Sequence, residues 1–398
     1  MKKIIALVLM AVMCMTLFVG CSNKTATTAA TTASSAVSAS TAASASSAAA
    51  ASTASASSAA ASSAAPDLKV GMVCNAISID DKSFNQATWE GITRAQKDFG
   101  IETKYLIASE QNTEGFEQAI SNLYDTGYRM IVTPGYTFAK AIFDAQTMYP
   151  DCKFVILDSA PQDDGADQPT IAQNSVGIDY AAQQAGFVAG FACALQLKEG
   201  EFGALFGQEI TPTKLFKTGF QQGVIYANEN YDCKIKMRDE NFVWSGSFSD
   251  AALGQQITAQ LYNSGCNLVY CACGTTALGG FNEAKARAEK GEDVWVVGCD
   301  VDQYDDGLLA DGSKSVTMTS TMKNLANSTY DEIKAALDGT FVGGQLITFD
   351  ASNDGVGIPA TNPNLSDEVQ SEANKILEKI KNGEITVSTD DTDVSAYN

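Results

Sequence analysis

Residues 79–91 (I-D-D-K-S-F-N-Q-A-T-W-E-G) place an aromatic ring and an amide at the predicted start of a helix. Asp81 and Ser83 are residue types that cap helices, and the apolar residues after them recur at helical spacing. Phe84 and Asn85 therefore fall in the first turn of this helix. The apolar run just before the stretch predicts a strand, so we expect the ring and the amide beside its carboxyl end.

This position is suited to holding a small molecule. In open parallel α/β sheets, ligands occupy the crevice outside the carboxyl ends of the strands. Unpaired backbone N–H groups, a ring and an amide together suit a flat polar molecule. The alternative is that Phe84 only holds the helix against the core.

Charged residues and a glycine occur where later apolar runs stop. Asp158, Gly274 and Asp300 each close or follow such a run, and Lys323 is predicted to open a late helix. Carboxylates accept hydrogen bonds from hydroxyl and N–H groups, and a lysine donates to acceptors. Each residue alone also fits a cap or a turn. Together, at corresponding strand ends, they predict a ligand site.

A second ring, Phe248, precedes a helix that Ser249 or Asp250 can cap. It is the counterpart, later in the chain, of Phe84. Two rings on facing lobes could hold a planar base between them, and such stacking contributes about 1–3 kcal/mol per base. The alternative is that Phe248 belongs to the core.

Several other kinds of site are excluded. The acidic run 300–307 has Tyr304 and Asp305 where a calcium-binding EF-hand loop needs a ligand and a glycine. The glycine-rich residues 274–280 lack the lysine of a P-loop. The chain has no histidine, which removes His-based acid–base catalysis, Ser-His-Asp triads and most metal sites.

Strands and helices are expected to alternate with a period of about 30 residues, which is typical of βαβ units around a parallel sheet. The expected strands are 68–74, 102–108, 129–134, 153–158, 171–179, 202–206, 233–239, 267–273, 294–299, 315–320 and 346–349. The expected helices begin near 83 and span 113–124, 137–149, 180–197, 212–228, 250–264, 276–290, 323–337 and 366–381.

This pattern predicts an α/β fold with two Rossmann-like lobes joined by several crossovers. The first lobe is expected to contain residues 66–179 and about 321–340. The second is expected to contain residues 180–320 and about 341–385, and residues 386–398 form a polar tail. A chain of this length exceeds what one hydrophobic core usually serves.

The amino-terminal region is predicted to direct export. Residues 1–20 have two lysines and an apolar core, as a signal peptide does, and the junction before Cys21 resembles a bacterial lipobox. Cys21 is then expected to carry lipid. Residues 22–65 are almost wholly Ala, Ser and Thr and cannot build a core, so 21–65 is predicted to be a disordered tether. The alternative is a plain secretory signal that is cleaved elsewhere.

The net charge of −21 argues against binding to nucleic acid or an anionic membrane through a basic face. Most of the cysteines beyond the export region lie in apolar runs, as buried free thiols do. Cys271 and Cys273 are expected to share one face of a strand. We expect core thiols, with Cys233 or Cys266 as the exceptions.

Several ordered motifs between about residues 68 and 337 resemble the basic membrane lipoprotein (BMP) family, whose members include the purine-nucleoside-receptor lipoproteins. These motifs are D-D-K-S-F-N-Q-A-T-W-E-G, T-P-G-Y-T-F, Y-P-D-C-K-F-V-I-L-D, S-V-G-I-D-Y-A-A-Q-Q-A-G-F-V-A-G and W-V-V-G-C-D-V-D-Q. The resemblance implies a type I periplasmic-binding fold. In that fold two lobes close on a ligand that an ABC importer then receives.

Carried over by position, the resemblance makes Phe84 and Phe248 the rings that stack on a base. The polar contacts around the base would be Asn75, Asn85 and Asp158. The contacts on the ribose side would be Gly274, Asp300 and Lys323. The family often has Asp and a glycine pair where this chain has Asn75-Ala76-Ile77-Ser78, and an amide there could change which base edge is accepted.

These observations predict a lipid-anchored binding protein on the extracytoplasmic face of the cell membrane. We expect it to capture nucleosides, purine nucleosides above all, and to deliver them to ABC permease subunits. A monomer without cofactor, metal, catalytic step or nucleic-acid partner is expected. The alternatives are a sugar or another small polar solute on the same scaffold, and nucleoside hydrolysis that uses Asp158 or Asp300.

Overall fold

The computed structural model describes residues 67–75 and 78–398, which belong to one compact unit, Ser62–Asn398. The predicted signal peptide, lipidated Cys21 and tether lie outside the described residues. In the described part, no helix has the length and apolar character needed to cross a membrane.

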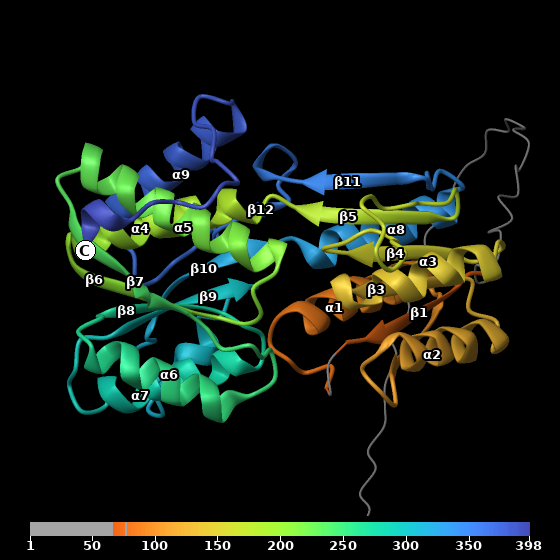
Figure 1. Cartoon of the computed structure of the whole chain (residues 1–398), viewed down its shortest axis with the longest axis horizontal. Coiled ribbons are helices and arrows are strands. Elements are labelled where there is room, and N and C mark those ends of the chain that lie inside the picture. Colours follow the sequence, from red (N-terminus) through yellow and green to blue (C-terminus); the bar gives the residue numbers. More distant parts are fainter. Residues whose placement is uncertain (1–66, 76–77) are drawn as a thin grey trace, which may run out of the picture. The chain divides into compact units, whose positions relative to one another are not determined.

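The first sheet contains six parallel strands in the order β11-β5-β4-β3-β1-β2 (Figure 1). They are β1 (Lys69–Cys74), β2 (Glu102–Ile107), β3 (Met130–Pro134), β4 (Lys153–Leu157), β5 (Ser175–Tyr180) and β11 (Gln345–Phe349). The order reverses between β1 and β3, which makes their carboxyl ends the switch point where such sheets bind ligands.

The second sheet repeats this order as β12-β10-β9-β8-β6-β7. Its strands are β6 (Glu199–Phe206), β7 (Lys234–Trp244), β8 (Leu268–Ala272), β9 (Trp295–Asp300), β10 (Thr317–Lys323) and β12 (Val356–Gly357). Only the short β12 is antiparallel, to β10. The corresponding switch point lies between β6 and β8. The predicted α/β class with two Rossmann-like sheets is confirmed.

Helices cover both faces of each sheet (Figure 1). They are α1 (Phe84–Phe99), α2 (Thr113–Asp125), α3 (Ala139–Met148), α4 (Ala182–Leu197), α5 (Thr211–Asn230), α6 (Ala251–Asn263), α7 (Thr276–Ala288), α8 (Leu325–Asp338) and α9 (Asp367–Lys381). Short 3-10 helices span Tyr136–Phe138, Asp305–Gly307, Ala351–Asn353 and Ser395–Tyr397. In the first lobe α2 and α3 pack on one face and α1 and α8 on the other. In the second, α6 and α7 pack opposite α4, α5 and α9.

The core follows the alternation of the strands. Along β8, Leu268 and Tyr270 enter the cluster beneath α4 and α5, whereas Val269 and Cys271 enter the cluster beneath α6 and α7. Cys273 continues on the face of Cys271, as predicted. Both faces are buried, which explains why these strands are continuous apolar runs.

Three crossovers join the lobes, and they differ from the predicted domain division. Helix α8 packs against α1 in the first lobe. Residues 321–323 were predicted to lie in the first lobe, but they belong to β10 of the second sheet. Strand β11 was predicted to lie in the second lobe, but it pairs with β5 in the first sheet. Strand β11 gives hydrogen-bond partners to the edge of β5, which would otherwise be open. The sequence did not reveal this long-range pairing.

Four smaller corrections concern individual residues. Lys323 ends β10 and does not open a helix, because α8 begins at Leu325. The cap of α2 is Asn112, whose side chain accepts from Gly115 N, and not the predicted Thr113. Cys233 and Cys266 are both buried and are therefore not exceptions among the thiols.

The carboxyl-terminal polar segment is packed on the second lobe. Val387 and Val394 are buried in its main core cluster. Ser388 N donates to Gln222 Oε1 at 3.0 Å, and Thr218 Oγ1 donates to Asp390 O at 2.6 Å. Two buried valines and hydrogen bonds between side chains and backbone therefore fix a segment whose composition alone predicts only a polar tail.

Candidate functional site

A cavity of about 360 Å³ lies where the carboxyl ends of strands from both sheets meet. Its volume is in the range of small-molecule sites in proteins. The lining includes every ligand-binding residue that the sequence predicted, namely Asn75, Phe84, Asn85, Asp158, Phe248, Gly274, Asp300 and Lys323. The structure thus brings all of them together. As ligand contacts they stay predictions.

The start of helix α1 is held by Asp81. Its carboxylate accepts from the backbone N–H groups of Ser83, Asn85 and Gln86 at 2.8–3.0 Å. Burial raises the pKa of Asp81, and the hydrogen bonds from Asn85 and Gln86 oppose that effect. Because Asp81 satisfies the helix terminus, the Ser83 hydroxyl is free to donate to Asp300 Oδ2 across the cavity, at 2.5 Å.

Asn85 is oriented by the same carboxylate. Its Nδ2 donates to Asp81 Oδ2 at 2.8 Å and to Asn75 Oδ1 at 3.0 Å. A reversed amide would place an oxygen against the Asp81 carboxylate, so this orientation is the favoured one. Asn85 is buried, and its Oδ1 has no hydrogen-bond partner within the described part of the chain. A buried acceptor without a partner is costly unless a ligand supplies a donor.

A charged cluster occupies another part of the lining. Lys323, which is buried, forms an ion pair with Asp158 and has its Nζ 4.0 Å from Asp300 Oδ1. Burial disfavours the ammonium, but Asp158 and Asp300 outweigh this and raise the pKa of Lys323. Burial raises the pKa of Asp158 to about 6, although Lys323 opposes the shift. One ammonium thus faces two carboxylates.

Both carboxylates stand on strained backbone. Asp158 follows β4 with φ 55° and Asp300 ends β9 with φ 68°, in the left-handed region that is unfavourable for residues other than glycine. Such strain costs about 1–3 kcal/mol and occurs preferentially at functional sites. The two positions correspond to each other in the two sheets, since β4 and β9 are each the second strand beyond the switch-point strand β1 or β6.

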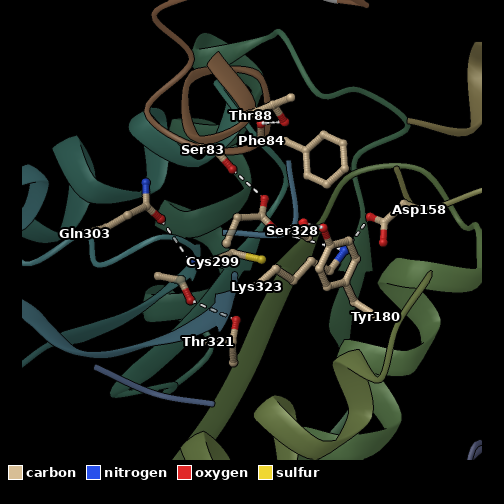
Figure 2. A network of polar contacts seen from close by, with 12 residues as sticks. Ser83, Phe84, Thr88, Asp158, Tyr180, Cys299, Gln303, Thr321, Lys323 and Ser328 are labelled. Atoms are coloured by element: carbon tan, nitrogen blue, oxygen red, sulfur yellow. Dashed lines mark hydrogen bonds and ion pairs between the residues drawn. The ribbon is translucent and has the colours of Figure 1, made fainter. Parts of the chain in front are cut away.

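Figure 2 shows how the first ring relates to this cluster. The Phe84 ring lies beside Lys323, whose Nζ is 5.3 Å from the ring centroid. The same ammonium is 4.9 Å from the Phe216 centroid and 5.6 Å from that of Tyr180. Tyr180 is fixed by its hydroxyl, which is 2.5 Å from Ser328 Oγ. Phe84 and Phe248 are both half-buried, so each has a surface that the core does not cover.

The sequence interpretation missed several polar lining residues at the same strand ends. They are Gln111, Tyr136, Thr137, Gln208, Ser247, Ser249 and Thr275. Tyr136 and Gln208 are each the second residue after a strand, β3 and β6 respectively, and the Tyr136 hydroxyl donates to Gln208 Oε1 at 2.5 Å. The rule that located the other residues, polar groups after apolar strands, would also have found these two.

The lining offers little for covalent chemistry. Its two thiols are Cys273 and Cys299, and burial raises the pKa of each well above the ordinary value, so both stay protonated. Across residues 67–75 and 78–398, no three Cys, Asp or Glu side chains are grouped so that they could hold a metal ion. Rings, amides and paired charges instead equip the cavity to bind.

Comparisons with known proteins agree with this architecture. An ABC transporter solute-binding protein from Aeropyrum pernix K1 superposes with a TM-score of 0.69 at 20% identity, covering 82% of this chain and 94% of that one. At this identity the likeness shows the fold, which confirms the predicted type I periplasmic-binding arrangement.

Sequence relatives extend over most of the chain. The CD4+ T-cell-stimulating antigen of Listeria monocytogenes is 29% identical over 332 residues, which cover 81% of this chain and 89% of that protein. The ABC transporter nucleoside-binding protein BmpA of Lactococcus lactis is 29% identical over 329 residues, with coverage of 81% and 89%. The model of the Bmp family, described as ABC transporter substrate-binding protein PnrA-like, matches residues 68–391. The chain therefore belongs to the Bmp family of PnrA-like ABC transporter substrate-binding proteins, which are binding proteins and not enzymes.

Proposed function

We propose that this protein captures nucleosides, purine nucleosides above all, and delivers them to an ABC importer. The observation that carries the proposal is the combination of two half-buried rings, Phe84 and Phe248, with the Lys323 charge cluster in one cavity. A nucleoside has the matching parts, a planar base and a ribose with hydroxyl groups. The printed name of the Lactococcus lactis relative, a nucleoside-binding protein, supports the same ligand class.

The ribose is proposed to bind at the charge cluster. Ribose hydroxyls can donate to the Asp158 and Asp300 carboxylates and accept from Lys323. Because two carboxylates face one ammonium, the cluster disfavours a further negative charge. A neutral nucleoside is therefore a better ligand than the corresponding nucleotide.

The base is proposed to lie between the rings, with its edge toward Asn85. The unpaired Asn85 Oδ1 needs a hydrogen-bond donor. Guanosine, inosine and adenosine each carry an N–H group on the base, which purine riboside lacks. A site that leaves a buried acceptor unpaired rejects such an analogue strongly.

We also propose that the protein acts outside the cytoplasm as a lipid-anchored monomer, with Cys21 as the anchor and residues 22–65 as the tether. A single acyl chain binds membranes weakly, so more than one is expected on Cys21. Fractionation tests this: wild type should partition with membranes, and Cys21→Ala should be released or keep its signal peptide. Native protein that lacks lipid and stays in the soluble fraction would contradict it.

Mass spectrometry of the small molecules that co-purify with the protein tests the ligand. A nucleoside released on denaturation is the expected result. A sugar or another solute in its place would support the alternative binding protein. Free base appearing when protein and nucleoside are incubated, and absent without protein, would support hydrolysis and contradict the proposal.

A further inference from the structure

We infer that Gly207 is a positioning residue that fixes the Phe248 ring where it lines the cavity. The inference rests on the proposed function, because the ring position matters only if a ligand stacks on it. Gly207 follows β6 and is not itself part of the cavity lining. It therefore acts on the ligand only through Phe248.

The contact between Gly207 and Phe248 leaves no room for a side chain. A methyl group on Gly207 would lie 2.2 Å from Cε1, 2.5 Å from Cδ1 and 2.8 Å from Cζ of the Phe248 ring. A Cβ atom almost never lies closer than 3.0 Å to a heavy atom of a residue that is not its chain neighbour. The ring thus lies directly against the Cα of Gly207. The φ angle of Gly207 is not positive, so an alanine could adopt this backbone and would act through the contact alone.

The backbone of Gly207 cannot retreat from the ring without breaking the sheet. Its N–H donates to the carbonyl oxygen of Ala272, the last residue of β8, at 3.2 Å. Its carbonyl accepts from Gly246 N, beyond β7, at 3.0 Å. Gly207 is therefore held from both sides.

The backbone of Phe248 is also held, from the side of α7. Its carbonyl accepts from Thr276 N at 3.3 Å, and the Thr276 hydroxyl donates to Ser247 O at 3.2 Å. A Cβ on Gly274 would lie 3.0 Å from the Phe248 carbonyl oxygen, so this loop has no slack there. With both backbones fixed, a methyl group on Gly207 forces the Phe248 side chain to rotate. Because the ring is half-buried and lines the cavity, its rotation changes the surface that it presents to the cavity.

Crystal structures of wild type and Gly207→Ala, both without added ligand, test the geometry directly. The expected result is a rotated Phe248 ring with the ends of β6 and β8 unchanged. A ring that keeps its place, with a shifted β6 in compensation, would overturn the inference. This readout does not depend on which solute the protein binds.

A double-mutant cycle of Gly207→Ala and Phe248→Ala tests the effect on binding, measured as the Kd for guanosine. Phe248→Ala should raise the Kd about 5- to 150-fold, the equivalent of the stacking contribution. In a protein that keeps Phe248, Gly207→Ala should raise the Kd by at most the factor expected for Phe248→Ala. In a protein that already carries Phe248→Ala, adding Gly207→Ala should leave the Kd unchanged. Melting temperatures should change little in either variant, since a displaced ring leaves the core intact.

The matched control is Gly357→Ala in β12, where the nearest atom to the added methyl would be 3.8 Å away and the φ angle is not positive. It should bind guanosine as wild type does. If Gly207→Ala weakens binding equally with and without Phe248, Gly207 does not act through the ring and the inference is wrong. If wild type binds no nucleoside, the proposed function fails, and the two crystal structures still decide whether Gly207 positions the ring.

Discussion

Lys323 provides one ammonium against the two carboxylates of Asp158 and Asp300, so this buried cluster has one more negative group than positive. Lys323 has a side-chain exposure of 2%, and Asp158 and Asp300 have 10% and 11%. Burying one ion pair already costs solvation energy, and a second carboxylate adds repulsion. Such a cluster is weak evidence for stability and stronger evidence for a ligand, because ribose hydroxyls would replace the lost solvation.

The raised pKa of Asp158 makes stability depend on pH. Its pKa rises from 3.8 in the unfolded chain to about 6 in the folded protein. The folded state therefore binds this proton more tightly than the unfolded chain does. The stability that this tighter binding adds is fully present below pH 3.8 and is lost as the pH rises through about 6. We expect Asp158→Asn to flatten the pH dependence of the unfolding free energy between these values, by about 1–3 kcal/mol.

Urea denaturation of wild type and Asp158→Asn from pH 4 to pH 7 measures this difference. Asp167→Asn is the control, because Asp167 is an exposed acid that does not line the cavity. Parallel curves for wild type and Asp158→Asn would show that Asp158 titrates normally in the folded protein.

The first turn of α1 is the element that connects the fold to the site. Asp81 caps the helix and orients Asn85, so one carboxylate serves both stability and the cavity lining. The Ser83 hydroxyl and a backbone carbonyl of the same loop then contact the second lobe, through Asp300 and through Gln303 Nε2 to Lys82 O at 3.2 Å.

Asp81→Ala should therefore impair both folding and binding. Loss of a cap lowers the free energy of unfolding by about 0.5–2 kcal/mol. Without the Asp81 carboxylate, the Asn85 amide also loses the partner that orients its oxygen and its N–H group at the cavity. Asn112→Ala is a matched control, since Asn112 caps α2 and does not line the cavity. Both variants should lower the urea midpoint, and only Asp81→Ala should weaken guanosine binding. Equal binding in the two variants would contradict this role of Asp81.

Most elements could be predicted from the sequence because buried parallel strands are short apolar runs between amphipathic helices. The same pattern located the site, since Asp158 and Gly274 directly follow such runs. What could not be predicted is non-local. The pairing of β11 with β5 and the contact of Gly207 with Phe248 depend on tertiary packing that no local spacing encodes. Asp81 was recognised as a cap, but its bond to the Asn85 amide needs the three-dimensional turn.

Across the whole described unit, the two lobes meet around the cavity and also at its polar margin. Tyr136 follows β3 of the first sheet and Gln208 follows β6 of the second, and their 2.5 Å hydrogen bond is exposed. Because ligands of two-lobed proteins leave by hinge opening, such a bond must break before release.

Tyr136→Phe should therefore release guanosine faster, by about 2- to 13-fold if the bond contributes the usual 0.5–1.5 kcal/mol. Stopped-flow dissociation measures this rate. Tyr124→Phe is the control, since the Tyr124 hydroxyl makes an exposed 2.6 Å bond to Asp151 within the first lobe. The unfolding free energies of Tyr136→Phe and Tyr124→Phe should be similar to each other. Unchanged dissociation in Tyr136→Phe would mean that this margin does not restrain opening.

Calorimetric titration of wild type and Phe84→Ala with guanosine, adenosine, inosine and their free bases measures whether the cavity binds nucleosides by stacking on this ring. We expect wild type to bind purine nucleosides and Phe84→Ala to lose about 1–3 kcal/mol of binding free energy while melting near the wild-type temperature. Wild type that binds no nucleoside would contradict the ligand assignment. A Phe84→Ala variant that binds normally but melts early would show that the ring serves the core and not the ligand.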